Sequence, residues 1–399
     1  MPVTGGLDPI GVRTNRLIDV GPWCIPRGVG VLSYYWDYVF ADGRARLPHS
    51  HVSLDLTYRC NLRCNMCFLY GQHLSGKNPT LETIGARKEL TIDEWRSVLD
   101  DLRALGVWSL VMSGGEVFLK QGFLELLAAA PRRGFAVSVL TNGSMIDRDE
   151  ARGLVENQPN FVRFSLDGDR DTHDAICMRP CYDRLFAGIG LIREEQRRQG
   201  RTLPELGFET VIQRRNQDRL CHVIELAHAN GIRRVTISNI FFTAGSDAAG
   251  AKPCEATAAG QTTREVDTDL YAIDPVVLDR ELRKVRAKAA DLGVAVTCRL
   301  RGIRDIQRVY GDPGFSYLNK CFYPWMMFRI NPYGDVIPCT GSSRSMGNVT
   351  ERPVGQIWNG ETFCGFRREL KGERLFDECR KCNTLADARW RVWNWLPRV

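Results

Sequence analysis

The chain has 399 residues, of which 44% are hydrophobic and 25% charged, as in an ordinary globular protein. Its formal net charge of +7 is spread over the chain rather than gathered in a basic tract, so the sequence does not indicate a nucleic-acid surface. No apolar run approaches the roughly 20 residues of a membrane span, and the first residues lack a signal-peptide pattern. The sequence therefore predicts a cytoplasmic protein without a membrane span.

Residues 1–48 precede any repeating pattern and are interpreted as an N-terminal extension. Within them, residues 32–40 are rich in aromatic side chains and are followed by the turn-like Ala41-Asp42-Gly43. Alternating aromatic residues are typical of half-buried strands, so this stretch predicts a strand pair packed on the main domain. A substrate-binding or membrane-binding patch is the alternative.

Three cysteines follow the first apolar run, residues 51–56. Cys60, Cys64 and Cys67 have the spacing Cys-x3-Cys-x2-Cys. Three thiolates can hold three irons of a four-iron cluster and leave the fourth iron open for chemistry. A zinc knuckle is the alternative, but zinc sites usually pair two Cys-x2-Cys units or add histidine. Fourteen cysteines in a chain without a secretion signal also favour metal ligands and free thiols over disulfides.

From residue 49 onward, apolar strand-like runs alternate with amphipathic helical segments, which is typical of a parallel sheet covered by helices. Six such strands are predicted, beginning at His51, Val107, Ala136, Phe161, Phe208 and Val235. A helix is predicted after the cysteine loop, opening at the capping box Thr91-Ile92-Asp93-Glu94. Residues 243–314 form a predicted linker or insertion with a connecting helix from Pro275 and a strand near Val294.

Several short motifs follow these strands directly. Gly114, Gly115 and Glu116 come after the second strand, Asn142 after the third, and Ser165 with Asp167 after the fourth. Phe68 follows the third cysteine of the loop. Barrel enzymes place their sites at such strand ends. Turn formation for the strand-end residues and core packing for Phe68 are the alternatives.

The cysteine spacing with its following aromatic residue resembles the signature of the radical S-adenosylmethionine (SAM) superfamily. The resemblance implies an α/β fold, a partial (β/α)6 TIM barrel at residues 49–242. It also implies a cluster whose open iron chelates SAM and cleaves it to a 5'-deoxyadenosyl radical. Gly114, Gly115 and Glu116 would then bind the SAM amine, although Val117 stands where the family usually has proline. Asn142, Ser165 and Asp167 would contact the SAM carboxylate or ribose, and Phe68 would lie near adenine.

A second set of cysteines lies in residues 315–399. Cys321 and Cys339 flank a predicted hairpin turn at 331–335, and Cys379 and Cys382 follow about forty residues later. This arrangement resembles the small twitch/SPASM-like iron-sulfur domain, which implies a second, auxiliary 4Fe-4S cluster with no vacant site. Structural zinc is the alternative, and Cys364 is an alternative ligand. The nearest resemblance by spacing is to twitch-type aminocyclitol dehydrogenases and aminoglycoside epimerases.

These resemblances predict an enzyme that abstracts a hydrogen atom from its substrate, with flavodoxin or ferredoxin as electron donor. Oxidation of a small oxygenated molecule, such as a sugar or aminocyclitol, is the main expectation. Epimerisation of such a molecule is one alternative, with Cys177 or Cys181 as hydrogen donor because these spare thiols follow the fourth strand. Crosslinking or epimerisation of a ribosomal peptide is another. An interaction module held by zinc is the non-enzymatic alternative.

Overall fold

The computed structural model describes residues 35–46, 51–67, 87–240, 268–312, 314–342, 344–376, 379 and 381–382. Phe68, most of the predicted extension, residues 241–242 of the predicted barrel and residues 243–267 of the predicted linker therefore lie outside the described residues. Within the described ranges, no helix combines the length and the apolar character needed to cross a membrane.

One nine-stranded sheet forms the centre of the molecule, in the order β7-β6-β5-β4-β3-β2-β1-β8-β9. Its strands are β1 (Val52–Asp55), β2 (Ser109–Ser113), β3 (Ala136–Thr141), β4 (Phe161–Ser165), β5 (Glu205–Ile212), β6 (Arg234–Asn239), β7 (Ala295–Cys298), β8 (Arg329–Ile330) and β9 (Val336–Ile337). All neighbouring strands run parallel except β8 and β9, which form the predicted antiparallel hairpin. The six strands expected from the sequence are confirmed, and the strand expected near Val294 extends the same sheet as β7.

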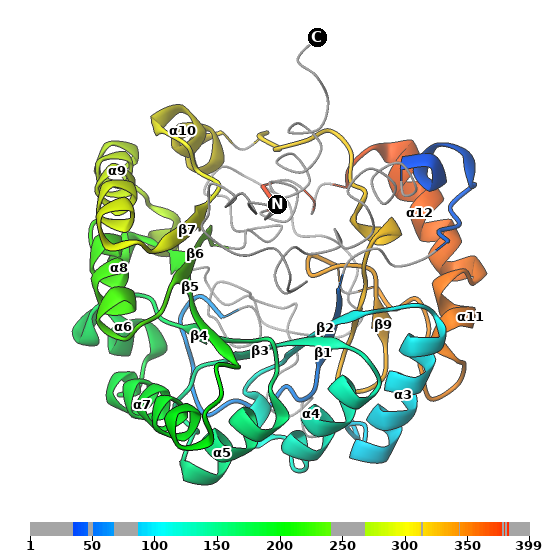
Figure 1. The fold of residues 1–399 in the computed structure, drawn as a ribbon. Helices are drawn as coiled ribbons and strands as arrows, with labels where there is room; N and C mark the ends of the chain where they lie inside the picture. The colour runs from blue at the N-terminus through cyan, green and yellow to red at the C-terminus, as the bar shows by residue number, and fades with distance from the viewer. Residues whose placement is uncertain are drawn as a thin grey trace, which may run out of the picture.

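The helices lie on the outer, convex side of the curved sheet (Figure 1). They are α3 (Ile92–Ala104), α4 (Phe123–Arg132), α5 (Arg148–Asn157), α6 (Arg170–Cys177), α7 (Tyr182–Gln199), α8 (Leu220–Ala229), α9 (Pro275–Leu292), α10 (Ile303–Gly311), α11 (Val354–Trp358) and α12 (Glu361–Glu373). Short 3-10 helices are η2 (Val117–Leu119), η3 (Arg214–Asn216), η4 (Thr268–Tyr271) and η5 (Tyr323–Trp325). The expected α/β class is confirmed. Because the strands are parallel, their carboxyl ends meet at one edge of the sheet.

Helix α3 shows how local sequence sets an element. Thr91 accepts a hydrogen bond from the Glu94 amide at 3.2 Å, and Glu94 accepts one from the Thr91 amide at 2.6 Å, so the predicted capping box is present. Trp95, Leu99 and Leu102 recur at helical spacing and are fully buried against the sheet. The helix therefore begins where the cap satisfies its free amides and packs through one apolar face.

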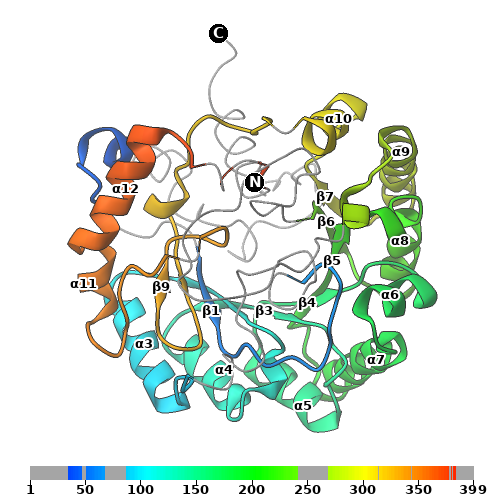
Figure 2. The same ribbon diagram turned by 180° about the vertical axis from the view of Figure 1, so that it is seen from behind.

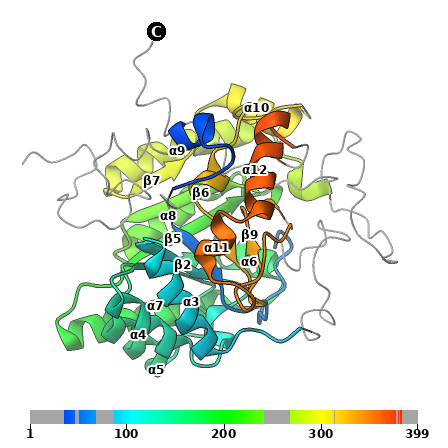
Figure 3. The same cartoon turned by 90° about the vertical axis from the view of Figure 1, so that its right-hand side faces the viewer.

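The strand pair expected in residues 32–40 is wrong, because residues 35–40 are helical. The ring centroids of Trp36 and Phe40, one helical turn apart, lie 4.6 Å from each other. Tyr38 points inward and packs edge-on against Phe322 and Trp325. Aromatic residues four positions apart, such as Trp36 and Phe40, lie on one face of a helix, while the alternating aromatic residues of the same stretch also fit a strand. The tertiary contacts of Tyr38 decide in favour of the helix. Figure 3 shows this segment beside α12.

The C-terminal hairpin joins the barrel through β1 rather than packing as a separate body. Ser53 and Leu54 of β1 pair with Arg329 and Ile330 of β8, and Figure 2 shows the hairpin beside β1. Arg329 forms an ion pair with Asp55 at the end of β1, and the two residues are only 6% and 4% exposed. This buried pair links the strand that precedes the first cysteine loop to the domain that carries the second cysteine set.

We expect Arg329→Met to lower the apparent free energy of unfolding by about 3 to 5 kcal/mol, because it leaves the Asp55 carboxylate buried without its partner charge. Chemical denaturation followed by circular dichroism measures this loss. Arg96→Met is the matched control, since Arg96 pairs with Asp93 and Glu125 at the surface and should cost about 0 to 1 kcal/mol. Equal effects of the two substitutions would contradict the importance of the buried pair.

Candidate active site

The first cysteine loop leaves β1 beside the glycine segment that follows β2. The Gly115 amide donates to Thr57 O at 2.7 Å, and the Glu116 amide donates to Arg59 O at 2.9 Å. The two backbones thus continue the pairing of β1 and β2 up to the residue before Cys60. Two motifs that lie about fifty residues apart in the sequence are held together at the carboxyl edge of the sheet.

The two glycines are required by this close approach. A Cβ atom on Gly115 would lie 2.3 Å from Arg59 O, and one on Gly114 would lie 2.3 Å from Thr57 O. Gly114 also has φ +143°, a conformation that residues with side chains rarely adopt. Any larger residue would displace the backbone that leads into Cys60.

The last turn of α6 supports the other side of the cysteine loop. The Arg63 amide donates to Cys177 O at 3.4 Å, and the Asn65 amide donates to Ile176 O at 3.0 Å. The Arg63 side chain turns back and donates to Cys60 O at 2.7 Å. The loop is therefore anchored at both ends by backbone groups.

The three predicted cluster cysteines are half-buried and free of disulfides. Burial raises the pKa of Cys60 to about 12, against the hydrogen bond from the Leu62 amide, which lowers it. The nearby Glu116, Cys64 and Cys67 raise it further. A bound cation would relieve this cost by favouring the thiolates. The environment of Cys60 therefore suits a metal-bound thiolate.

Glu116 lies inside the protein with its carboxylate occupied by neighbouring donors. It accepts hydrogen bonds from Thr141 Oγ1 at 2.7 Å, from the Asn142 amide at 2.8 Å and from the Phe118 amide at 3.3 Å. Burial raises its pKa, although these hydrogen bonds lower it in part. In this structure Glu116 ties the end of β2 to the end of β3. Its contact with SAM stays a prediction.

Asn142 is joined to the cysteine loop through a residue that sequence reasoning missed. Its Nδ2 donates to Asn61 Oδ1 at 3.0 Å, while Asn61 Nδ2 donates to Ser144 Oγ at 2.8 Å. Asn61 lies directly after Cys60, and that position was the one signal for it in the sequence. The network aligns the end of β3 with the loop.

Ser165 and Asp167 follow β4 but have different environments. Ser165 is exposed. Asp167 is 1% exposed, and its Oδ1 accepts the Val211 amide at 2.8 Å. Burial raises the pKa of Asp167 to about 6, with His173 and the Val211 amide opposing the rise. Of the two, Ser165 is therefore the one placed to meet a ligand without rearrangement.

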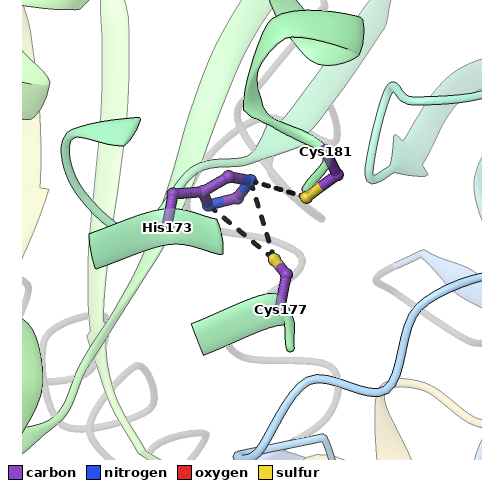
Figure 4. A group of neighbouring side chains, drawn as sticks. All are labelled: His173, Cys177 and Cys181. Carbon is purple, nitrogen blue, oxygen red and sulfur yellow. Dashed lines mark hydrogen bonds between the residues drawn. The ribbon is translucent and has the colours of Figure 1, made fainter. Parts of the chain in front are cut away.

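Cys177 and Cys181 lie together with His173 in a buried group (Figure 4). His173 Nε2 is 3.6 Å from Cys177 Sγ and 3.5 Å from Cys181 Sγ. Asp174 fixes the turn, because its Oδ1 accepts the amides of Cys181 and Tyr182 at 2.8 and 2.9 Å. Sequence reasoning found the cysteines but missed His173, although the spacing His-x3-Cys-x3-Cys was visible. Their role as hydrogen donors stays a prediction.

The second cysteine set lines one pocket. Its lining includes all four predicted ligands together with aromatic and aliphatic side chains, namely Cys321, Cys339, Cys379, Cys382, Phe366, Leu370 and Phe376. Burial raises the pKa of Cys339 to about 12, and the neighbouring Cys382 raises it further. Cys364 does not appear among the described lining residues, and its Sγ instead lies 3.5 Å from Asn359 O. The pocket thus gathers the predicted set without Cys364.

Ligand spacing distinguishes a cluster from a single zinc ion. Tetrahedral zinc with bonds of about 2.3 Å holds its sulfurs about 3.8 Å apart. Within the described ranges, the only group of three potential ligand atoms that all lie within 4.8 Å is His173, Cys177 and Cys181. Neither predicted ligand set is that compact. Wider spacing fits a four-iron cluster, in which each thiolate binds a different iron.

Comparison with known proteins agrees with this geometry. Residues 54–203 match the model of the radical SAM superfamily, and residues 321–383 match that of SPASM, an iron-sulfur cluster-binding domain. This chain contains a radical SAM domain followed by a SPASM domain. It is therefore a radical SAM enzyme whose cofactors are 4Fe-4S clusters and SAM.

Three relatives illustrate the likeness. The chain is 25% identical to the Fe-coproporphyrin III synthase of Methanosarcina barkeri over 366 residues, which cover 84% of this chain and 80% of that protein. It is 28% identical to the PqqA peptide cyclase of Ruegeria pomeroyi over 341 residues, covering 82% and 78%. Its fold is similar to that of Streptococcus suis SuiB bound to the precursor peptide SuiA, with a TM-score of 0.59, 16% identity and coverage of 82% and 68%.

We expect Gly115→Ala to displace Arg59 and to prevent loading of the first cluster while the SPASM cluster remains. The iron content should fall from about eight to about four per chain, as measured by metal analysis after anaerobic reconstitution. Gly190→Ala in α7 is the control, because no atom lies within 4 Å of the added Cβ. Full iron content in Gly115→Ala would show that the loop tolerates the displaced backbone.

Asp167 gives a pH-dependent prediction. Its pKa is raised from 3.8 to about 6 in the folded protein, so the folded state binds more protons than the unfolded state between these values. Its contribution to stability should therefore decrease by roughly 1.4 kcal/mol per unit as pH rises from about 4 to 6. Urea unfolding at several pH values should show this decrease in the wild type but not in Asp167→Asn. Asp100→Asn, which changes a carboxylate at the surface, is the control and should show the same decrease in stability as the wild type.

Proposed function

We propose that this radical SAM enzyme modifies a peptide, forming a crosslink or inverting a carbon after hydrogen abstraction. The supporting observation is the PqqA peptide cyclase, whose similarity spans 82% of this chain and 78% of that enzyme. The fold is also similar to that of SuiB bound to its precursor peptide SuiA. A sugar or aminocyclitol, expected from the cysteine spacing, has no comparable support.

The proposal assigns Cys60, Cys64 and Cys67 to the SAM-binding cluster and Cys321, Cys339, Cys379 and Cys382 to one auxiliary cluster. A cluster held by three thiolates supplies an open iron and one electron for SAM cleavage. Gly114 and Gly115 keep the loop against the sheet, and Glu116 and Asn142 hold the neighbouring strand ends. Ser165 presents its hydroxyl at the end of β4.

A porphyrin is the second candidate substrate class. The observation that favours it is the Fe-coproporphyrin III synthase, whose similarity covers 84% of this chain. In both classes the cluster ligands and strand-end residues have the same roles. Only the substrate and the fate of its radical differ, so product analysis can separate them.

The first test replaces Cys60, Cys64 and Cys67 together by alanine. This variant should remain folded and keep the SPASM cluster, but it should form no 5'-deoxyadenosine from SAM and dithionite. Cys221→Ala is the matched control, because Cys221 lies on α8 with its amide bonded to Glu281. Continued reductive cleavage of SAM by the triple variant would refute the assignment.

The second test asks for the substrate class. Reconstituted enzyme, SAM and reductant are incubated either with a library of peptides deuterated at Cα and Cβ or with iron porphyrin precursors from which Fe-coproporphyrin III could be formed. Deuterium transfer from a peptide into 5'-deoxyadenosine, together with a peptide product of changed mass or chirality, is the expected result. Turnover of the porphyrin alone would reject a peptide substrate.

A further inference from the structure

The buried group His173, Cys177 and Cys181 lies directly against the first cysteine loop. Cys177, Cys181 and Leu62 form a small buried cluster, and Cys60 and Cys64 pack on it. The loop amides of Arg63 and Asn65 donate to the last carbonyls of α6. Cys177 is thus in side-chain contact with Cys64, one of the proposed cluster ligands.

The proton on His173 can be located from its partners. The Asp167 amide donates to Nδ1 at 3.2 Å, so Nδ1 presents a lone pair and the ring proton lies on Nε2. Nε2–H then points at Cys177 Sγ and Cys181 Sγ, at 3.6 and 3.5 Å. A metal-bound histidine has the opposite arrangement, with its second nitrogen donating a proton. The group is therefore a hydrogen-bonding unit rather than a third metal site.

The direction of the Cys177 proton follows from this arrangement. The sulfur of Cys177 accepts from His173, so its own S–H is available to a different acceptor. Cys181 and Cys64 are the sulfurs beside it. Cys181 Sγ already accepts from His173 Nε2 at 3.5 Å, whereas a thiolate bound to a cluster carries negative charge and accepts a further hydrogen bond strongly. Cys64 is therefore the preferred acceptor when the cluster is bound.

We propose that Cys177 donates an S–H hydrogen bond to the cluster-bound thiolate of Cys64 and thereby raises the reduction potential of the SAM-binding cluster. His173 and Cys181 are positioning residues that hold the Cys177 thiol in this orientation. Hydrogen bonds to cluster sulfurs are among the factors that set the potential. They stabilise the reduced state more because it carries one more negative charge. The inference rests on the proposed assignment of Cys64 as a ligand.

The test compares Cys177→Ala, Cys177→Ser and the control Cys221→Ala. The midpoint potential is measured by redox titration of the electron paramagnetic resonance signal that changes when SAM is added, which separates this cluster from the SPASM cluster. Cys177→Ala should shift the potential to a more negative value, so that a weaker reductant no longer supports SAM cleavage. Cys177→Ser, which keeps a proton donor, should restore the potential, and Cys221→Ala should leave it unchanged.

An unchanged potential in Cys177→Ala would overturn the inference while leaving the ligand assignment intact. A SAM-responsive signal that survives in Cys64→Ala would instead refute the assignment itself. If Cys177→Ala fails to load the cluster, the test instead compares wild type and Cys177→Ser in deuterated water by electron paramagnetic resonance. Both should show an exchangeable deuteron coupled to the SAM-responsive cluster, and its absence in wild type would overturn the inference. The inference would also be overturned if the wild-type protein contained one zinc ion per chain and this zinc were lost when His173 is replaced.

Discussion

The structure depends on a backbone contact at the carboxyl edge of the parallel sheet. Gly115 and Glu116 donate their amides to the segment between β1 and Cys60, and this contact determines where the cysteine loop begins. The interaction requires two residues without side chains, because a Cβ at either glycine would overlap a carbonyl oxygen. Reactive cofactors need fixed ligands, and here main-chain hydrogen bonds supply that rigidity.

The same edge brings together residues from several strand ends. The Glu116 carboxylate accepts hydrogen bonds from Thr141 Oγ1 and the Asn142 amide, and the Asn142 side chain donates to Asn61 in the loop. The motif residues therefore act first on one another. Burial explains why the carboxyl groups of Glu116 and Asp167 have raised pKa values, because it disfavours the charged form of each carboxyl group.

The two domains are joined by more than chain connectivity. Hairpin strand β8 pairs with β1, and Arg329 neutralises Asp55 in the interior. The last strand before the first cysteine loop is thus also the strand on which the SPASM hairpin is built. This shared strand fixes the position of one cysteine set relative to the other.

The sequence by itself determined the alternation of strands and helices, both cysteine sets and the strand-end motifs, because period, spacing and turn chemistry are local properties. It also identified the capping box of α3. The strand pair predicted for residues 32–40 was wrong, because the aromatic spacing fits a strand or a helix and the packing of Tyr38 on Phe322 and Trp325 favours the helix. The spacing of His173, Cys177 and Cys181 was visible in the sequence, but only the tertiary structure brought Cys177 against Cys64. Such contacts depend on how α6 packs on a loop more than a hundred residues earlier, and no local pattern records that distance.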